Sequence, residues 1–155
     1  MFHIVLVEPE IPANTGNISR TCAITGAALH LIKPLGFSID DKHLKRAGLD
    51  YWHLLDLHIY ENLDEFLAQH GDKRLFLATT KSAKHYDEVE FQDGDFIVFG
   101  KETAGLPQRM HDSYPDTRIK IPMLDNEAAR SLNLSNSAAI ILYEALRQVG
   151  FLNLK

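Results

Sequence analysis

Three stretches of this chain combine glycine, proline and small polar residues in a way that favours ligand binding. The first, PEIPANTGNISR at Pro9–Arg20, carries prolines that stiffen the backbone because their rings fix φ. The second, FGKETAGLP at Phe99–Pro107, places Glu102 beside glycines that let a backbone approach a ligand closely. The third, IPM at Ile121–Met123 followed by RSLNLSN at Arg130–Asn136, crowds amides and hydroxyls before a helical pattern. We expect the three stretches to converge on one ligand site.

The first stretch has two interpretations. Gly16 would permit a tight entry into a helix that Asn17 caps, and the amides at such a helix N-terminus favour anions such as RNA phosphate. Arg20, about one turn into that helix, could then reach over its end. The same residues would also fit an ordinary capped helix with a surface arginine and no ligand. This stretch alone therefore does not identify a ligand.

Several common catalytic sites are excluded because their motifs are missing. A serine or threonine follows the lysine of a Walker phosphate loop, but Glu102 follows Lys101 here, and the dinucleotide pattern G-x-G-x-x-G is absent. The sequence also lacks the G-x-S-x-G motif of serine hydrolases. Its eight histidines include no H-x-x-x-H pair, and its one cysteine, Cys22, cannot form a thiolate cluster. We therefore expect no metal site.

The elements that must position these stretches follow from two alternating patterns. Short apolar runs predict strands, and helical patterns between them predict an α/β fold, with a mainly parallel sheet flanked by helices. The expected strands are His3–Val7, Leu29–Ile32, Leu57–Tyr60, Leu75–Thr79, Phe96–Phe99 and Arg118–Ile121. The expected helices lie near Asn17–Gly26, Asp40–Ala47, Leu63–His70, Leu106–Ser113 and Ser135–Val149. Ligands bind beyond the carboxyl ends of the strands in such a sheet, which is where the three stretches fall.

Composition narrows the class of protein and its compartment. The 155 residues fit one domain, and 45% hydrophobic with 24% charged residues is ordinary for a globular protein. The formal net charge of −5 argues against sequence-independent binding of nucleic acid but leaves room for a local basic face. The single cysteine favours a reducing compartment, the short apolar start lacks the positive flank of a signal peptide, and no run approaches a membrane span. We expect a cytoplasmic protein.

In this order, the three stretches resemble the three motifs of the SPOUT methyltransferases. They are most similar to the small bacterial tRNA (cytidine/uridine) 2′-O-methyltransferases that modify the wobble nucleotide. The resemblance runs from Ile4 to Tyr143 and includes PLGF at Pro34–Phe37 and LKRAGLDY ending at Tyr51. It implies a single SPOUT domain over residues 1–155, whose C-terminal part forms a deep trefoil knot, a rare exception to unknotted topology.

The resemblance also implies a cofactor and a set of site residues. The cofactor is S-adenosylmethionine, bent and held largely by backbone groups. Its contacts would fall on Ala78, Thr79, Gly100, Ile121, Met123, Ser131 and Leu132. The catalytic positions would be Arg20, Asn14, Glu102 and Asn133. We add Lys45 and Arg46 as candidate RNA contacts, because the phosphate backbone attracts basic side chains. Many close relatives have proline and arginine where this chain has Lys101 and Ala104, which bears on RNA positioning.

The resemblance further implies a homodimer with shared sites, each combining the cofactor of one subunit with Arg20 of the other. The apolar stripe through Ile141 and Ala145 fits such an interface, and it fits a monomer core equally well. Two other functions stay open. One is a base-nitrogen RNA methyltransferase of the same fold, although the N-x-x-G-N-I-x-R block resembles the ribose-modifying branch. The other is a non-catalytic RNA-binding or ribosome-assembly module, but the retained Arg20, Glu102 and Asn133 argue against it.

Overall fold

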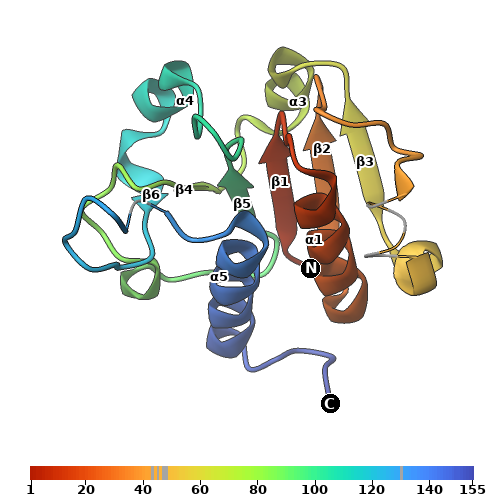
Figure 1. The fold of residues 1–155 in the computed structure, drawn as a ribbon. Helices are drawn as coiled ribbons and strands as arrows, with labels where there is room; N and C mark the ends of the chain where they lie inside the picture. The colour runs from red at the N-terminus through yellow and green to blue at the C-terminus, as the bar shows by residue number, and fades with distance from the viewer. Residues whose placement is uncertain (43, 45, 47–48, 130) are drawn as a thin grey trace.

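A parallel sheet forms the centre of the protein. The structure is a computed structural model that describes residues 1–42, 44, 46, 49–129 and 131–155. Within these residues the sheet has six strands in the order β3-β2-β1-β5-β4-β6, and every neighbouring pair is parallel (Figure 1). The strands are β1 (His3–Val7), β2 (Ala28–Ile32), β3 (Leu57–Tyr60), β4 (Leu75–Ala78), β5 (Phe96–Phe99) and β6 (Arg118–Ile119). The expected α/β class with a mainly parallel sheet is confirmed.

Helices cover both faces of the sheet. They are α1 (Pro12–Thr25), α3 (Leu63–His70), α4 (Gln108–Ser113) and α5 (Leu134–Gln148), with 3₁₀ helices η1 (Leu49–Leu54), η2 (Tyr86–Glu88) and η3 (Pro115–Thr117). On one face, α1 and α5 lie side by side, and Ile18 and Ile141 pack with strand residues such as Ile4 (Figure 1). On the other, Phe66 of α3 and Met110 of α4 are buried. Because both faces are covered, the central strands β1, β2, β4 and β5 are mainly apolar, whereas the edge strand β3 is partly exposed. None of the described helices is long and apolar enough to cross a membrane.

The start of α1 differs from the sequence expectation. The helix begins at Pro12, so Asn17 is not its N-cap and Gly16 lies within the helix instead of at its entry. Proline suits a first helical turn, because the N–H that it lacks would have no partner there. The N-cap position is Ile11, whose side chain makes no capping hydrogen bond. The polar residues after Pro12 are therefore helical and partly buried, although their composition is typical of a loop.

The remaining boundaries shift by one to three residues, several of them at the strand ends and helix starts beside the ligand-binding stretches. β4 ends at Ala78 and β6 at Ile119, both short of the expected ends. α4 begins at Gln108, after its expected start, and Asn133 caps α5 in place of the expected Ser135. The helix expected near Asp40–Ala47 falls partly outside the described residues.

A chain of polar rings crosses the face of the sheet that α3 covers. His3 Nδ1 lies 2.9 Å from His30 Nε2, and His30 Nδ1 lies 2.9 Å from Tyr60 Oη. Tyr60 Oη in turn lies 3.1 Å from His70 Nε2. Burial, reinforced by neighbouring imidazoles, lowers the pKa of His3 to about 4 and that of His30 to about 3. The folded protein therefore holds these two imidazoles in the neutral form at neutral pH.

Candidate functional site

A cavity of about 580 Å³ lies beyond the carboxyl ends of β4, β5 and β6. An open parallel sheet usually binds its ligand at such a place. The lining comes from the start of α1, the loop after β5, the segment after β6 and the first turns of α5. It includes all the residues expected to contact a cofactor, namely Ala78, Thr79, Gly100, Ile121, Met123, Ser131 and Leu132. The structure thus brings together residues from stretches that are far apart in the sequence.

The loop after β5 folds back so tightly that only glycine fits at its start. Lys101 and Gly105 form an antiparallel bridge, in which the Gly105 N–H donates to the Lys101 carbonyl at 2.9 Å. A Cβ on Gly100 would lie 2.1 Å from the carbonyl carbon of Gly105 and 2.2 Å from the nitrogen of Leu106. Gly105 has φ +71°, in the left-handed region that glycine adopts without strain. The two glycines therefore set the shape of this cavity wall.

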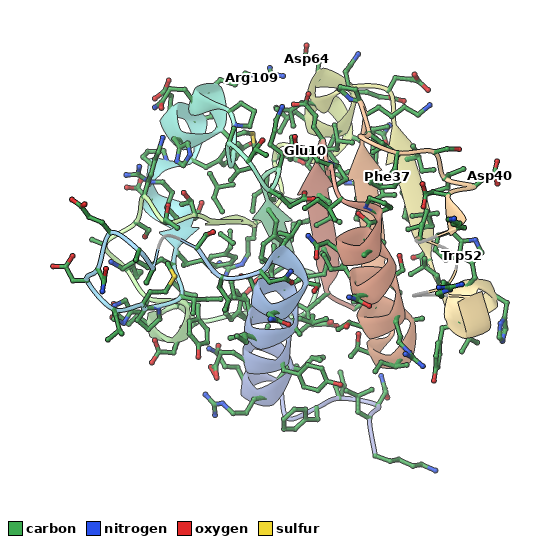
Figure 2. All side chains as sticks on the ribbon, viewed as in Figure 1. Glu10, Phe37, Asp40, Trp52, Asp64 and Arg109 are labelled. Atoms are coloured by element: carbon green, nitrogen blue, oxygen red, sulfur yellow. The ribbon has the colours of Figure 1, made fainter. Side chains whose placement is uncertain are left out.

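Two glutamates tie this loop reciprocally to the N-terminus of α1, and we call Glu10 and Glu102 the glutamate clamp. The Glu102 carboxylate accepts hydrogen bonds from the backbone N–H groups of Glu10, at 3.1 Å, and of Ile11. The Glu10 carboxylate, labelled in Figure 2, accepts from the Thr103 N–H at 3.0 Å and the Thr103 hydroxyl at 2.8 Å. These bonds from Thr103 lower the pKa of Glu10. Glu102 thereby supplies the negative charge that a helix N-terminus favours.

Asn14 and Asn133 join the N-terminal turns of α1 and α5 at the cavity wall. The side-chain amide of Asn133 donates to Asn14 Oδ1 at 3.1 Å, and Asn14 is buried. Asn133 Oδ1 accepts from the backbone N–H groups of Ser135 at 2.9 Å and Asn136 at 3.2 Å, and so caps α5. Asn133 therefore uses its oxygen for the helix cap and its nitrogen for the link to α1.

His111 is a cavity residue that sequence reasoning missed. It lines the cavity from α4, is 4% exposed, and its Nδ1 has no hydrogen-bond partner among the described residues. Burial lowers its pKa, and the positive charges of Lys81 and Arg118 lower it further. No motif pointed to His111, because its position depends on how α4 folds over the strand ends. Thr103 lies within the second stretch, but its role was missed because Glu10, which accepts its hydrogen bonds, lies far away in the sequence.

Arg20 lies apart from the cavity. It is exposed on α1, about 9 Å along the helix axis from Asn14, and does not line the cavity. Its guanidinium lies over the ring of Tyr51 in η1, with Cζ 4.7 Å from the ring centroid. Of the two expected RNA contacts, Arg46 is exposed and Lys45 lies outside the described residues. The structure therefore gathers the other three expected catalytic residues at the cavity and leaves Arg20 outside it.

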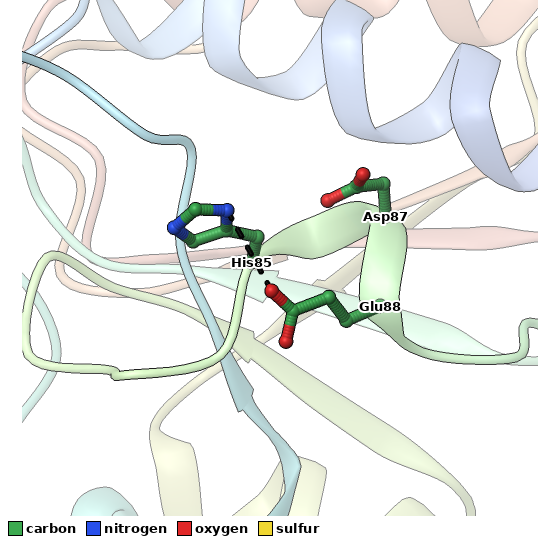
Figure 3. A group of neighbouring side chains, drawn as sticks. All are labelled: His85, Asp87 and Glu88. Carbon is green, nitrogen blue, oxygen red and sulfur yellow. Dashed lines mark ion pairs between the residues drawn. The ribbon is translucent and has the colours of Figure 1, made fainter.

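One group among the described residues has the donors and spacing to hold a cation. His85, Asp87 and Glu88, drawn in Figure 3, place one ligand atom each within 4.8 Å of the others. An ion pair of 3.7 Å joins His85 Nδ1 and Glu88 Oε1. Both carboxylates are exposed, and exposed acidic groups commonly lie together without an ion. The group therefore assigns no metal chemistry to the protein.

Known proteins share both the sequence and the fold. The chain is 53% identical over 152 residues to the tRNA (cytidine(34)-2′-O)-methyltransferase of Methylovorus glucosotrophus, with 97% of each chain covered. It is 48% identical over 152 residues to the Escherichia coli protein of the same name, covering 97% of this chain and 96% of that one.

Solved structures extend the likeness to the backbone. One that concerns the 2-OH methylation of C/U34 on tRNA matches with a TM-score of 0.88 and 42% identity, covering 96% of both chains. The SpoU methyltransferase AviRb of Streptomyces viridochromogenes, in complex with the cofactor AdoMet, matches with a TM-score of 0.83 and 25% identity. That match covers 95% of this chain and 60% of AviRb.

The family assignment rests on the match over most of the chain together with these relatives. Residues 1–143 match the family described as the SpoU rRNA Methylase family, and all three stretches lie within that span. The resemblance inferred from the stretches is confirmed, and the chain belongs to the SpoU rRNA methylase family.

Proposed function

We propose that the protein is an S-adenosylmethionine-dependent methyltransferase that methylates the ribose 2′-oxygen of the wobble nucleotide, cytidine or uridine 34, in tRNA. The observation that carries this proposal is the single cavity that gathers the expected cofactor residues with Asn14, Glu102 and Asn133. We assign the substrate by analogy with the named relatives, whose sequences are about half identical to this chain over nearly their full length. Residues 1–155 would form one SPOUT domain, with a deep trefoil knot in its C-terminal part, that works in the cytoplasm.

The cavity suits S-adenosylmethionine in size and in chemistry. Its volume of about 580 Å³ lies within the usual range for a small-molecule site. Apolar side chains such as Leu106 and Ile141 line it and could hold an adenine ring. Within the described part of the chain, the backbone N–H groups of Ile121, Met123 and Leu132 have no hydrogen-bond acceptor. Free main-chain donors beside apolar walls fit a cofactor that is held by the backbone.

Arg20 would act on the RNA side of the reaction. The bound cofactor supplies a methyl group on a positively charged sulfur, and the ribose 2′-oxygen must lie near it and in line. A guanidinium stays protonated at any ordinary pH, so Arg20 is a poor general base. It would instead neutralise the neighbouring phosphate and the alkoxide that develops on the 2′-oxygen. The proton would leave to phosphate or water.

The other three expected catalytic residues would shape the site. The Glu102 carboxylate already accepts hydrogen bonds from two backbone N–H groups. It would therefore hold the loop after β5 in place rather than transfer a proton. Asn14 and Asn133 are bonded to each other and would fix the two helix ends beside the reacting atoms. Lys45 and Arg46 remain our candidates for contacts to RNA phosphate.

A homodimer would complete each site. Arg20 lies outside the cavity of its own chain, so the guanidinium that faces the sugar would come from a second copy. Large apolar side chains are exposed on α5, at Ile140 and Tyr143, and beside the cavity, at Leu124 and Leu132. Exposed large apolar side chains of this kind are common at protein interfaces. A solution measurement that finds only 17.5 kDa particles at micromolar concentration would exclude shared sites.

The decisive experiment incubates the protein with labelled S-adenosylmethionine and bulk tRNA, and then maps the methylated nucleotide by mass spectrometry. We expect one 2′-O-methyl group at position 34. A methyl group on a base nitrogen would support the alternative methyltransferase instead. Calorimetry separates the third possibility, because a non-catalytic RNA-binding module would bind tRNA but release no heat with S-adenosylmethionine.

A further inference from the structure

Among the side chains that the structure describes, which leave out those of residues 43, 45, 47–50 and 130, no carboxylate forms an ion pair with Arg20. Arg74, Arg109 and Arg147 each donate to a carboxylate, at 2.7, 2.6 and 2.8 Å. Arg20 instead has its Cζ 4.7 Å from the centroid of the Tyr51 ring, and its Nη2 lies 3.5 Å from Tyr51 Oη. A permanently charged side chain is thus held by an aromatic ring and not by an acid.

Stacking and ion pairing occupy different parts of an arginine side chain. A carboxylate occupies the N–H edge of the guanidinium, whereas an aromatic ring occupies its face. A stacked guanidinium therefore keeps its edge free for another anion, while it has lost part of the torsional freedom of a long exposed side chain. Tyr51 is half-buried in η1, and η1 packs against α1, so the ring is itself anchored.

We propose that Tyr51 is a positioning residue for methyl transfer. Its ring holds the face of Arg20 so that the N–H edge stays available for RNA phosphate and for the charge that develops on the 2′-oxygen. The inference rests on the proposed role of Arg20 in catalysis. The ring matters in this arrangement and the hydroxyl does not, because 3.5 Å is the outer limit of a hydrogen bond.

The kinetic test removes the ring and the hydroxyl separately. The rate of a single methylation turnover on tRNA is measured with saturating cofactor for the parent, Tyr51→Phe and Tyr51→Leu. We expect Tyr51→Phe to stay within about twofold of the parent and Tyr51→Leu to be about three- to tenfold slower, the effect of one cation–π contact. Cofactor affinity, measured by calorimetry, should be unchanged in both. Trp52→Leu in the same 3₁₀ helix is the matched control and should keep the parent rate.

A spectroscopic test follows the stacking directly and requires neither RNA nor turnover. The Nε–Hε resonance of Arg20 is assigned by its absence in Arg20→Lys. In the parent and in Tyr51→Phe, the ring current should shift this resonance away from the position of a free arginine. In Tyr51→Leu it should return to that position.

The outcomes separate this inference from the proposed function. If Arg20→Lys methylates at the parent rate, the proposed role of Arg20 fails, and the inference fails with it. If Arg20→Lys is slow but Tyr51→Leu is as fast as the parent, only the inference fails. It also fails if the resonance does not move, if Trp52→Leu is equally slow, or if Tyr51→Leu slows the Arg20→Lys variant by the same factor as the parent.

Discussion

Acid should destabilise this protein through His30, which is buried, and His3, which is half-buried. The pKa of His3 is lowered to about 4 and that of His30 to about 3, chiefly because burial disfavours the charged imidazole. An unfolded histidine titrates near 6.5, so the unfolded chain takes up protons first as the pH falls. Stability is therefore fully present above about pH 6.5 and declines from there down to the folded-state pKa values.

The expected loss of stability is large for a protein of this size. At pH 5, an imidazole that is protonated in the unfolded chain but neutral in the folded one costs the native state about 2 kcal/mol. His3 and His30 both stay neutral at that pH, so together they should remove about 4 kcal/mol from the free energy of unfolding. A small domain has only about 5–15 kcal/mol in total.

Urea denaturation at pH 7.5 and pH 5, followed by the fluorescence of Trp52, measures this loss. His30→Phe removes one of the two imidazoles, so its stability should fall by about half as much between the two pH values. The same substitution breaks the hydrogen bonds to His3 and Tyr60, so only the difference between the two pH values is compared. The control is His53→Asn, which changes an exposed histidine. Equal acid losses in the parent and His30→Phe would refute the reasoning.

Three further predictions test the loop, the helix cap and the core. Gly100→Ala should lower the free energy of unfolding by about 2 kcal/mol or more, because its Cβ meets the Gly105 backbone, and a urea midpoint equal to the parent's would contradict this loop geometry. Asn133→Ala should lose about 1 kcal/mol of helix capping in the same assay. Asn133→Ser should recover that stability but still methylate slowly, because serine offers Asn14 no amide; a parent rate would refute that link. The Cys22 thiol, whose pKa is raised by burial, should react with a thiol reagent only after unfolding, and prompt labelling of the native protein would contradict its position.

The sheet could be predicted closely from the sequence because its central strands β1, β2 and β5 are buried on both faces. These strands are short, mainly apolar runs, and the expected His3–Val7 and Phe96–Phe99 agree with the structure at both ends. The expected Leu57–Tyr60 also agrees at both ends, although this edge strand is more exposed. The start of α1 could not be predicted in this way. Its N-terminal turn is stabilised by Glu102, which lies in a loop far along the chain, and local patterns contain no information about such a partner.

The sequence predicted which stretches of the chain form the site, but it did not predict most of the contacts between their side chains. Glycine, proline and amide residues marked the loops that surround the cavity, because those residue types have local conformational reasons to be there. The reciprocal bonds of Glu10 and Glu102, the burial of His111 and the ring under Arg20 depend on tertiary packing. None of them has a spacing that a sequence pattern could reveal.

The glutamate clamp connects events in the cavity to the helix that carries Arg20. The loop after β5 lines the cavity, and its Glu102 accepts the backbone N–H groups of Glu10 and Ile11 just before α1. A ligand that stiffens this loop must also stiffen that junction. Amide hydrogen exchange at Glu10 and Ile11 would then slow when the cavity fills, and tRNA would meet a better ordered surface on an already loaded enzyme. We therefore expect an ordered kinetic sequence, with the small molecule first and the nucleic acid second.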